Sequence, residues 1–165
     1  MRRISALVLL SLLAMTLAAP VSAATTISVS AFVKENFERA PSDEPCVFVE
    51  EPISLTCFGR GNAGRFGPIT SVVVFTEDAT TRTITLRDGS TITLDEVYPD
   101  ESTPGNSANA PGADRSFGNP VFVTGTWEVV DATGNLTGAT GSGTISQVLA
   151  GNTIQIWFDG TLTLP

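Results

Sequence analysis

Apolar and polar residues alternate along most of the chain after residue 24, which is the period of half-buried β-strands. Short turns rich in Gly, Asn and Asp separate these stretches, and none of them keeps the 3.6-residue period of an amphipathic helix over a useful length. Strands are predicted in the hairpin described next and in seven further stretches: 26–33, 46–50, 53–58, 69–77, 120–130, 141–150 and 152–164. We therefore expect an all-β protein of about eight antiparallel strands, a barrel or a sandwich. The barrel is favoured because closure removes exposed sheet edges.

The alternation predicts one hairpin in residue detail. Isoleucine and leucine alternate with threonine on both sides of residues 87–89. Opposite residues of an antiparallel pair share a face, so the two apolar sets match only across a loop with an odd number of residues. A three-residue loop over 87–89 meets this requirement, with Gly89 in the left-handed conformation of a G1 bulge. Ile84 should then lie opposite Ile92.

The first 23 residues have the layout of a secretory signal peptide. Two arginines precede an apolar run over 7–17, and small residues ending at Ala23 form a cleavage site. No later apolar run approaches the about 20 residues that a membrane-spanning helix needs. We expect cleavage after Ala23 and a single barrel domain over 24–165, secreted or periplasmic and without a membrane span.

The net charge of the mature chain limits the classes of molecule that it is expected to bind. Removal of the two arginines near the start leaves seven basic and seventeen acidic residues, a net charge of −10. Such a surface repels nucleic acid and anionic lipid head groups, so neither is expected to bind. It also suits solubility outside the cell.

The two cysteines, Cys46 and Cys57, both lie in the exported part of the chain. An even number of cysteines in an oxidising compartment indicates a disulfide, with buried free thiols as the alternative. If Cys46 faces Cys57 across a pair of strands, then Phe48 faces Leu55. Two thiols without any histidine are too few ligands for a metal site, so we expect no metal and no cofactor.

A glycine-dense run over 131–146 is similar in composition to a phosphate-binding loop, but it lacks the residues and the following helix that bind phosphate. It holds no lysine, and a strand pattern rather than a helix follows it. Its glycines are better explained by positive φ angles and close strand packing at a barrel corner. These are Gly134, Gly138, Gly141 and Gly143.

Two windows of the sequence carry a resemblance. The segment TGTWEVVDATGNLTGATGSGTI resembles the GTGxFxxAxGxG segment of the allene oxide cyclase and dirigent-like barrels. The segment CFGRGNAGRFG resembles the GxGxxxHLGRF stretch of the secreted bacterial members of that group, whose function is unknown, with Gly64-Arg65-Phe66 matching GRF. The resemblance implies an eight-stranded antiparallel barrel, often a homotrimer, with a central cavity for small hydrophobic molecules. The matching positions, Phe66 and the glycines at 64, 134, 138, 141 and 143, are scaffold positions, and no catalytic residue carries over.

The strongest group of polar candidates is Arg82, Glu96 and Tyr98. By strand parity these residues share the apolar face of the hairpin, so we expect them at the mouth of the barrel interior. An Arg–Glu pair beside a tyrosine could orient the polar head of a ligand or stabilise a developing oxyanion. The alternative is a salt bridge at the barrel rim, of little energetic value.

For two further groups of charged residues, a solvent-exposed surface position is an alternative to a functional role. Glu128, beside Trp127, could be a carboxylate of the lumen with a raised pKa, but Thr124 and Thr126 share its face, which favours a solvent-facing stripe. Lys34, with acidic and basic neighbours over 34–39, is interpreted as a solvated charge cluster.

Aromatic residues and one long loop complete the candidates. Trp157 lies on the polar side of its strand, as a subunit contact or a partly covered surface residue. Four phenylalanines are expected to face inward: Phe48, Phe75, Phe122 and Phe158. The irregular stretch 99–118 is either a functional lid or a disordered insertion. Its acidic residues, Asp100, Glu101 and Asp114, lack the spacing of a calcium loop.

Three functions remain open from the sequence. The preferred one is binding of a small apolar or amphipathic ligand in an unfilled lumen, with residues 99–118 near one mouth. A cofactor-free cyclase or isomerase would instead need a polar cluster inside that lumen. A structural or surface-interaction protein would have a barrel packed solid by its inward aromatic residues.

Overall fold

The computed structural model describes residues 24–36, 46–98, 121–150 and 153–165. The predicted signal peptide and the loop predicted at 99–118 lie outside these residues. Nine strands are described: β1 (Thr25–Asn36), β2 (Val47–Glu50), β3 (Ile53–Asn62), β4 (Pro68–Thr76), β5 (Thr80–Leu86), β6 (Thr91–Val97), β7 (Val121–Ala132), β8 (Thr140–Ala150) and β9 (Thr153–Leu164). Two short 3-10 turns join them, η1 (Gly64–Phe66) and η3 (Gly134–Leu136).

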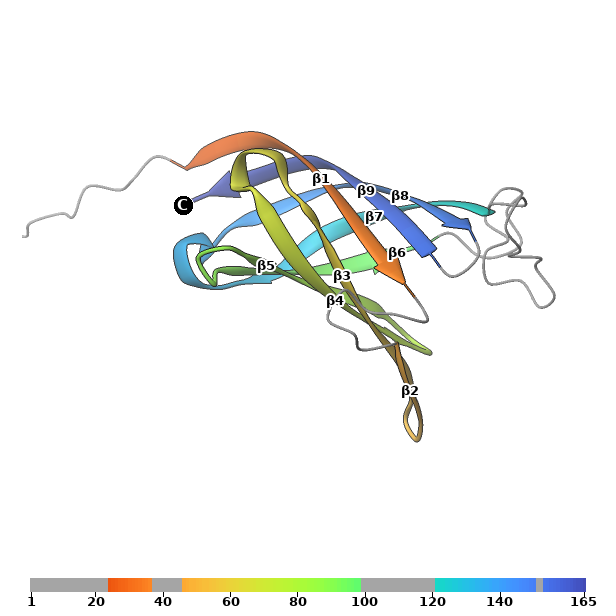
Figure 1. Ribbon diagram of the computed structural model, residues 1–165. Helices are drawn as coiled ribbons and strands as arrows, with labels where there is room; N and C mark the ends of the chain where they lie inside the picture. Colours follow the sequence, from red (N-terminus) through yellow and green to blue (C-terminus); the bar gives the residue numbers. More distant parts are fainter. Residues whose placement is uncertain (1–23, 37–45, 99–120, 151–152) are drawn as a thin grey trace, which may run out of the picture.

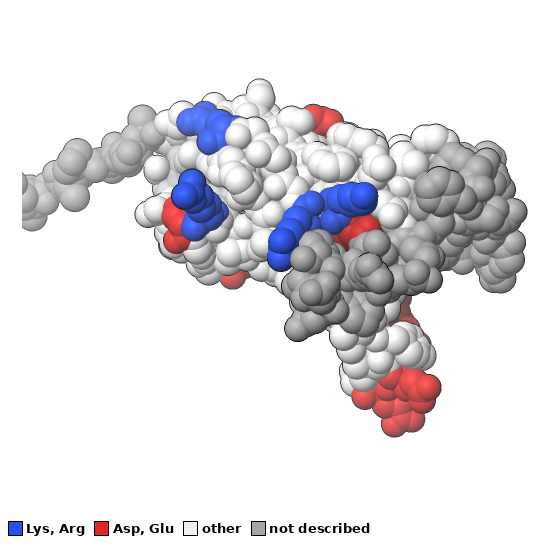
Figure 2. Space-filling model, in the orientation of Figure 1, with Lys and Arg blue, Asp and Glu red and all other residues white. Residues whose placement is uncertain are grey.

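The strands form a closed, antiparallel, eight-stranded barrel with one additional strand (Figure 1). The sheet order is β1-β9-β8-β7-β6-β5-β4-β3-β2, and pairing between β1 and β3 closes the barrel. β3 has two neighbours along this edge: its first half pairs with β2 and its second half with β1. The predicted all-β barrel is therefore confirmed, and the β2–β3 hairpin extends beyond it, with acidic side chains at its tip (Figure 2).

The predicted hairpin is confirmed in its register. Ile84 lies opposite Ile92, and Arg82 lies opposite Leu94. Gly89 has φ 85°, the left-handed value that the three-residue loop requires. The parity of these two strands therefore decides which side chains enter the barrel.

The glycine-dense run ends one strand and begins the next, as predicted. Gly134, the first residue of η3, and Gly138, two residues after this turn, have positive φ angles of 64° and 81°. Gly143 and Gly160 lie opposite each other in β8 and β9, and the Trp127 indole covers both of them. At this point the sheet has no room for a Cβ atom, because the backbone of the facing strand and the indole occupy its place.

We expect Gly143→Ala to lower the free energy of unfolding by about 1–3 kcal/mol, the usual cost of overpacking a core. The new Cβ would lie 2.7 Å from Cζ2 of Trp127 and still closer to the backbone oxygen of Asp159. Urea unfolding measures this difference. Ser142→Ala, on the exposed face of the same strand, is the control, and equal stabilities of the two variants would contradict the packing described.

Four phenylalanines were predicted to face inward; Phe158 does so and is buried, and Phe75 has the inward parity of the buried Ile69, Ser71 and Val73. Phe48 and Phe122 are each 60 % exposed, and Phe75 is half-buried. Phe48 does face Leu55 as predicted, but it does so on the hairpin that leaves the barrel. In β7 it is Val123, not Phe122, that turns inward, so the interior is filled mainly by aliphatic side chains.

The barrel interior has two chemically different ends. The end with η1, η3 and the loop after β5 is apolar, and the chain enters β1 and leaves β9 there (Figure 1). The other end, where β1, β6 and β8 finish, holds every buried charged side chain among the described residues. This division positions the two candidate sites described next.

Candidate functional site

A cluster of charged side chains fills the second end of the barrel, with Arg82 at its centre. Arg82 on β5 has no exposed surface. Its Nε donates to Oε1 of Glu96 on β6 at 2.5 Å, and its Nη1 donates to Oγ of Ser71 on β4 at 2.8 Å. The same Nη1 forms an ion pair with Oε1 of Glu35, on β1. One guanidinium thus ties together four strands of the barrel.

Two more polar side chains extend the cluster. The Tyr98 hydroxyl donates to Oε2 of Glu96 at 2.7 Å, and the side-chain amide of Gln147 on β8 donates to the Tyr98 oxygen. Gln147 is buried and Tyr98 half-buried. The sequence therefore placed Arg82, Glu96 and Tyr98 correctly on one inward face, but they lie inside the barrel and not at an exposed rim.

Glu35 is the member of the cluster that the sequence analysis assigned wrongly. It was placed in a solvated cluster with Lys34, yet its side chain is 1 % exposed. β1 runs past residue 33 to residue 36, so Glu35 has the inward parity of Val33. Gly59, on the neighbouring strand, makes room for it: a Cβ there would lie 2.8 Å from Cγ of Glu35. The alternation of inward and outward side chains continues along β1 past Val33, and following it in the sequence would have identified Glu35 as an inward-facing residue.

The electrostatics of the cluster follow from its burial. Burial raises the pKa of Glu35 above its ordinary value, although Arg82 opposes this shift. Burial alone would lower the pKa of Arg82, but the carboxylates of Glu96 and Glu35 raise it above its ordinary value. Burial, and next the charge of Glu96, raise the pKa of the Tyr98 hydroxyl. The second Glu35 oxygen has no hydrogen-bond partner among the described residues, which costs less in a neutral carboxyl group than in a carboxylate.

The raised pKa of Glu35 predicts a pH-dependent stability. The folded protein binds this proton more tightly than the unfolded chain, so the associated stability is fully present below about pH 4.5 and is lost as the pH rises through the folded-state pKa. Glu35→Gln keeps the group neutral. We expect the free energy of unfolding of the native protein, relative to that of the variant, to fall by up to about 1.4 kcal/mol per pH unit in this window. Urea unfolding from pH 4 to pH 8 tests this, and parallel curves for the two proteins would contradict it.

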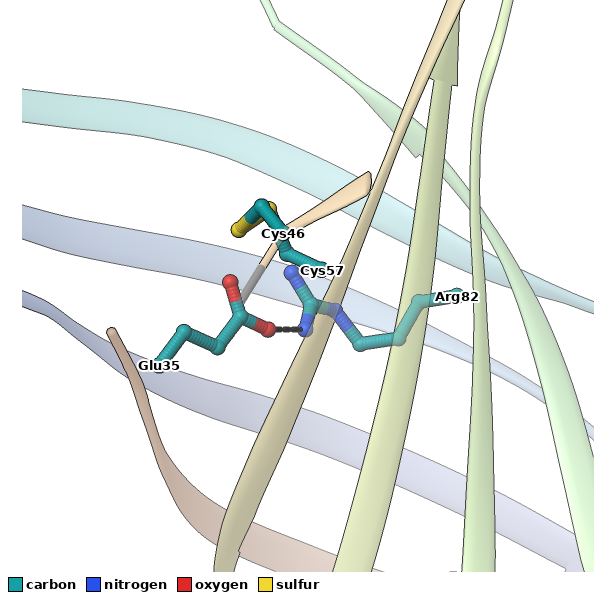
Figure 3. The surroundings of a disulfide bond; sticks show 4 residues. All are labelled: Glu35, Cys46, Cys57 and Arg82. Carbon is teal, nitrogen blue, oxygen red and sulfur yellow. Dashed lines mark hydrogen bonds and ion pairs between the residues drawn. A yellow bond between two sulfur atoms is a disulfide. The ribbon is translucent and has the colours of Figure 1, made fainter. Parts of the chain in front are cut away.

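The predicted disulfide joins Cys46 to Cys57, with a Cα–Cα distance of 4.3 Å. Cys57 is fully buried in β3, next to the charged end of the barrel. Glu35 and Arg82 belong to the surroundings of this bond, and the Glu35 carboxyl group points toward Arg82 (Figure 3). The disulfide therefore fixes the base of the β2–β3 hairpin to the strand that covers the charged cluster.

A pocket of about 50 Å³ lies at the opposite, apolar end. Apart from Ser30, the residues of its wall are apolar, and most of them come from β1, β5, β6, β7 and β9 and from the turns η1 and η3. Among them are Ala31, Ala63, Phe66, Trp127, Leu136 and Phe158. Phe66 and Leu136 belong to the two 3-10 turns, so the glycine-bearing turns that the sequence singled out position part of the pocket wall.

Phe158 lies between the pocket and the charged cluster. Its ring lines the pocket, and the ring centroid is 5.4 Å from Cζ of Arg82. A guanidinium over an aromatic face is a favourable contact. The Phe158 ring therefore separates the pocket from the charged cluster, and a molecule in the pocket would contact Phe158 rather than Arg82.

The remaining candidates lie on the outside of the barrel. Glu128 is exposed, so the interpretation as a lumen carboxylate is wrong and that of a solvent-facing stripe is correct. Trp157 is 37 % exposed, and its ring centroid lies 5.5 Å from that of Phe32. The acidic residues considered for calcium lie outside the described residues, within which no three or more Cys, Asp or Glu gather in a group that could hold a metal ion.

Comparisons with family models, with curated proteins and with solved structures found no match. The resemblance to the allene oxide cyclase and dirigent-like barrels, and the homotrimer that it implies, therefore stay predictions. In the part of the chain that the structure describes, no helix has the length and apolar character needed to span a membrane.

Proposed function

We propose that this protein binds a small apolar or amphipathic molecule, whose apolar part enters the pocket between η1 and η3. The observation that carries the proposal is the apolar wall of this pocket in a closed barrel. Cavities with apolar walls stay dry and take up apolar guests. The disulfide is compatible with an oxidising compartment, which supports the further proposal that the protein acts after export.

The size of the pocket limits the ligand. Its volume of about 50 Å³ is several times the ~10–15 Å³ that one water needs, but well below the ~300 Å³ of a typical drug-sized site. A short alkyl chain or part of a ring therefore fits, and the rest of the ligand stays outside the mouth. Binding is favoured over cyclase or isomerase chemistry because the polar cluster lies behind Phe158.

A titration with straight-chain alcohols tests this proposal. The chain has two tryptophans, so Trp157→Phe leaves Trp127, in the pocket wall, as the reporter. We expect 1-hexanol to 1-decanol to change the Trp127 emission saturably. Ala31→Leu should abolish the change because the leucine fills the pocket, whereas Ser28→Leu, on the exposed face of β1, should preserve it. An equal response in both leucine variants, or none in the parent, would contradict the proposal.

A further inference from the structure

The β2–β3 hairpin has the surface of a docking element. We call β2 with residues 53–56 of β3 the arm. Its apolar side chains are largely exposed: Val47, Val49 and Ile53 are 43–50 % exposed and Phe48 is 60 % exposed. Within the described residues, β2 pairs only with β3, so its other edge carries unpaired backbone groups. Exposed apolar edges of this kind mark sites of pairing with another chain.

The tip of the arm is acidic. Glu50 and Glu51 are both exposed at the turn between the two strands, and Figure 2 shows acidic side chains gathered at this end of the molecule. The arm therefore combines an apolar shaft with a negatively charged end.

The opposite combination lies on the outer face of the barrel, where β9, β1 and β3 meet. Lys34 and Arg60 are directly opposite each other across β1 and β3, and both are exposed. Beside them Phe32 packs against the partly exposed Trp157. We call these four residues the basic face; basic side chains on this side of the barrel are visible in Figure 2.

The basic face is unfavourable as long as nothing covers it. Like charges directly opposite each other in a sheet are destabilising. Neither Lys34 nor Arg60 forms an ion pair with a carboxylate of the described residues. Tryptophan and arginine are also the residue types most enriched at the energetic centres of protein interfaces.

The protein's own acidic tip cannot neutralise this face. Ile53 and Arg60 are seven residues apart on one extended strand, which corresponds to about 23 Å. The Debye length at physiological ionic strength is about 8 Å, so the two charge groups of one chain are screened from each other. The acidic tip of a second molecule is not limited by this distance and can reach the basic face.

We propose that the arm of one copy docks on the basic face of a second copy. Glu50 and Glu51 would pair with Lys34 and Arg60, while Phe48 would pack near the Trp157–Phe32 pair. The complementary charges identify the second copy as the occupant, because one chain carries both halves of the contact. The interaction is separate from the proposed pocket, which lies at the end of the barrel away from the arm.

Sedimentation velocity from 1 to 100 µM tests the proposal by exchange of charges. We expect the native protein to associate in this range. The arm variant E50K/E51K and the face variant K34E/R60E should each weaken association at least tenfold. An equimolar mixture of these two should associate again, because the reversed charges are complementary in the mixed pair. E77K/D78K makes the same charge change in the exposed turn after β4 and should associate like the native protein.

Circular dichroism and the intact mass confirm that each variant is folded and keeps its disulfide. A native protein that is monomeric at 100 µM would overturn the proposal. So would arm and face variants that associate as tightly as E77K/D78K, or a mixture that stays monomeric. Loss of the pocket response to alcohols would leave this result unchanged, so the two proposals fail separately.

Discussion

Arg82→Met is expected to lower the free energy of unfolding by about 3–5 kcal/mol, the usual cost of removing one partner from a buried ion pair. The variant leaves the Glu35 and Glu96 carboxyl groups inside the barrel without their cation. It also removes the guanidinium N–H group that donates a hydrogen bond to Oγ of Ser71. Urea unfolding at pH 7 measures the loss, and Arg87→Met, in the exposed hairpin loop, should change the stability by less than about 0.5 kcal/mol.

A second variant separates the charge effect from packing. In R82M/E35L/E96L the whole ion cluster becomes apolar, and buried charges replaced in this way are often neutral or stabilising. We therefore expect the triple variant to recover most of the stability that Arg82→Met loses. If the triple variant is less stable than the single one, the cost lies in shape and not in unpaired charge.

Trp127→Ala is expected to cost about 3–5 kcal/mol, the range for large aromatic residues in a core. The indole is buried against Gly143 and Gly160, and its Nε1 donates to the backbone oxygen of Thr144 at 3.0 Å. Its removal should join a new cavity to the existing pocket. Trp157→Ala removes the other tryptophan, from a partly exposed position, and should cost much less.

Indole provides a rescue for this variant. A cavity of matching shape should bind free indole, and binding to the folded state alone raises stability by mass action. We expect millimolar indole to raise the melting temperature of Trp127→Ala above that of the same protein without indole, with a smaller effect on the native protein. An equal effect on both proteins would contradict the placement of Trp127 in the pocket wall.

The parts of this fold that depend on local parity could be predicted from the sequence. The loop at Gly89 and the alternation around it place Arg82 and Glu96 on one inward face, and that placement is correct. The Cys46–Cys57 disulfide was predicted from the even number of cysteines in an exported chain, and the facing of Phe48 and Leu55 that goes with it is confirmed. These features need only neighbours in the chain and the two-residue period of a strand.

The features that escaped prediction depend on contacts between distant segments. Glu35 lies in a run of charged residues that was interpreted as a solvated cluster. The pairing of β1 with β9 and β3 keeps this residue extended and buried. Phe122 is a different case: it shares the parity of Thr124, Thr126 and Glu128, so the alternation along β7 already indicated that it turns outward. The sequence also did not predict that the arm projects from the barrel, because the pattern of β2 does not differ from that of the strands that form the barrel. Its position outside the barrel follows from the closure of β1 onto β3.

The most direct test of the proposed function is native mass spectrometry of the protein isolated from the organism that produces it, followed by denaturation of the same sample. We predict an additional mass on the native protein, lost on denaturation, that belongs to a molecule with an apolar chain or ring small enough to enter the pocket. Refolded protein exposed to the released molecule should regain that mass, and Ala31→Leu should not. A native protein that carries no additional mass, and takes up none from the lipid extract of its source, would contradict ligand binding in this barrel.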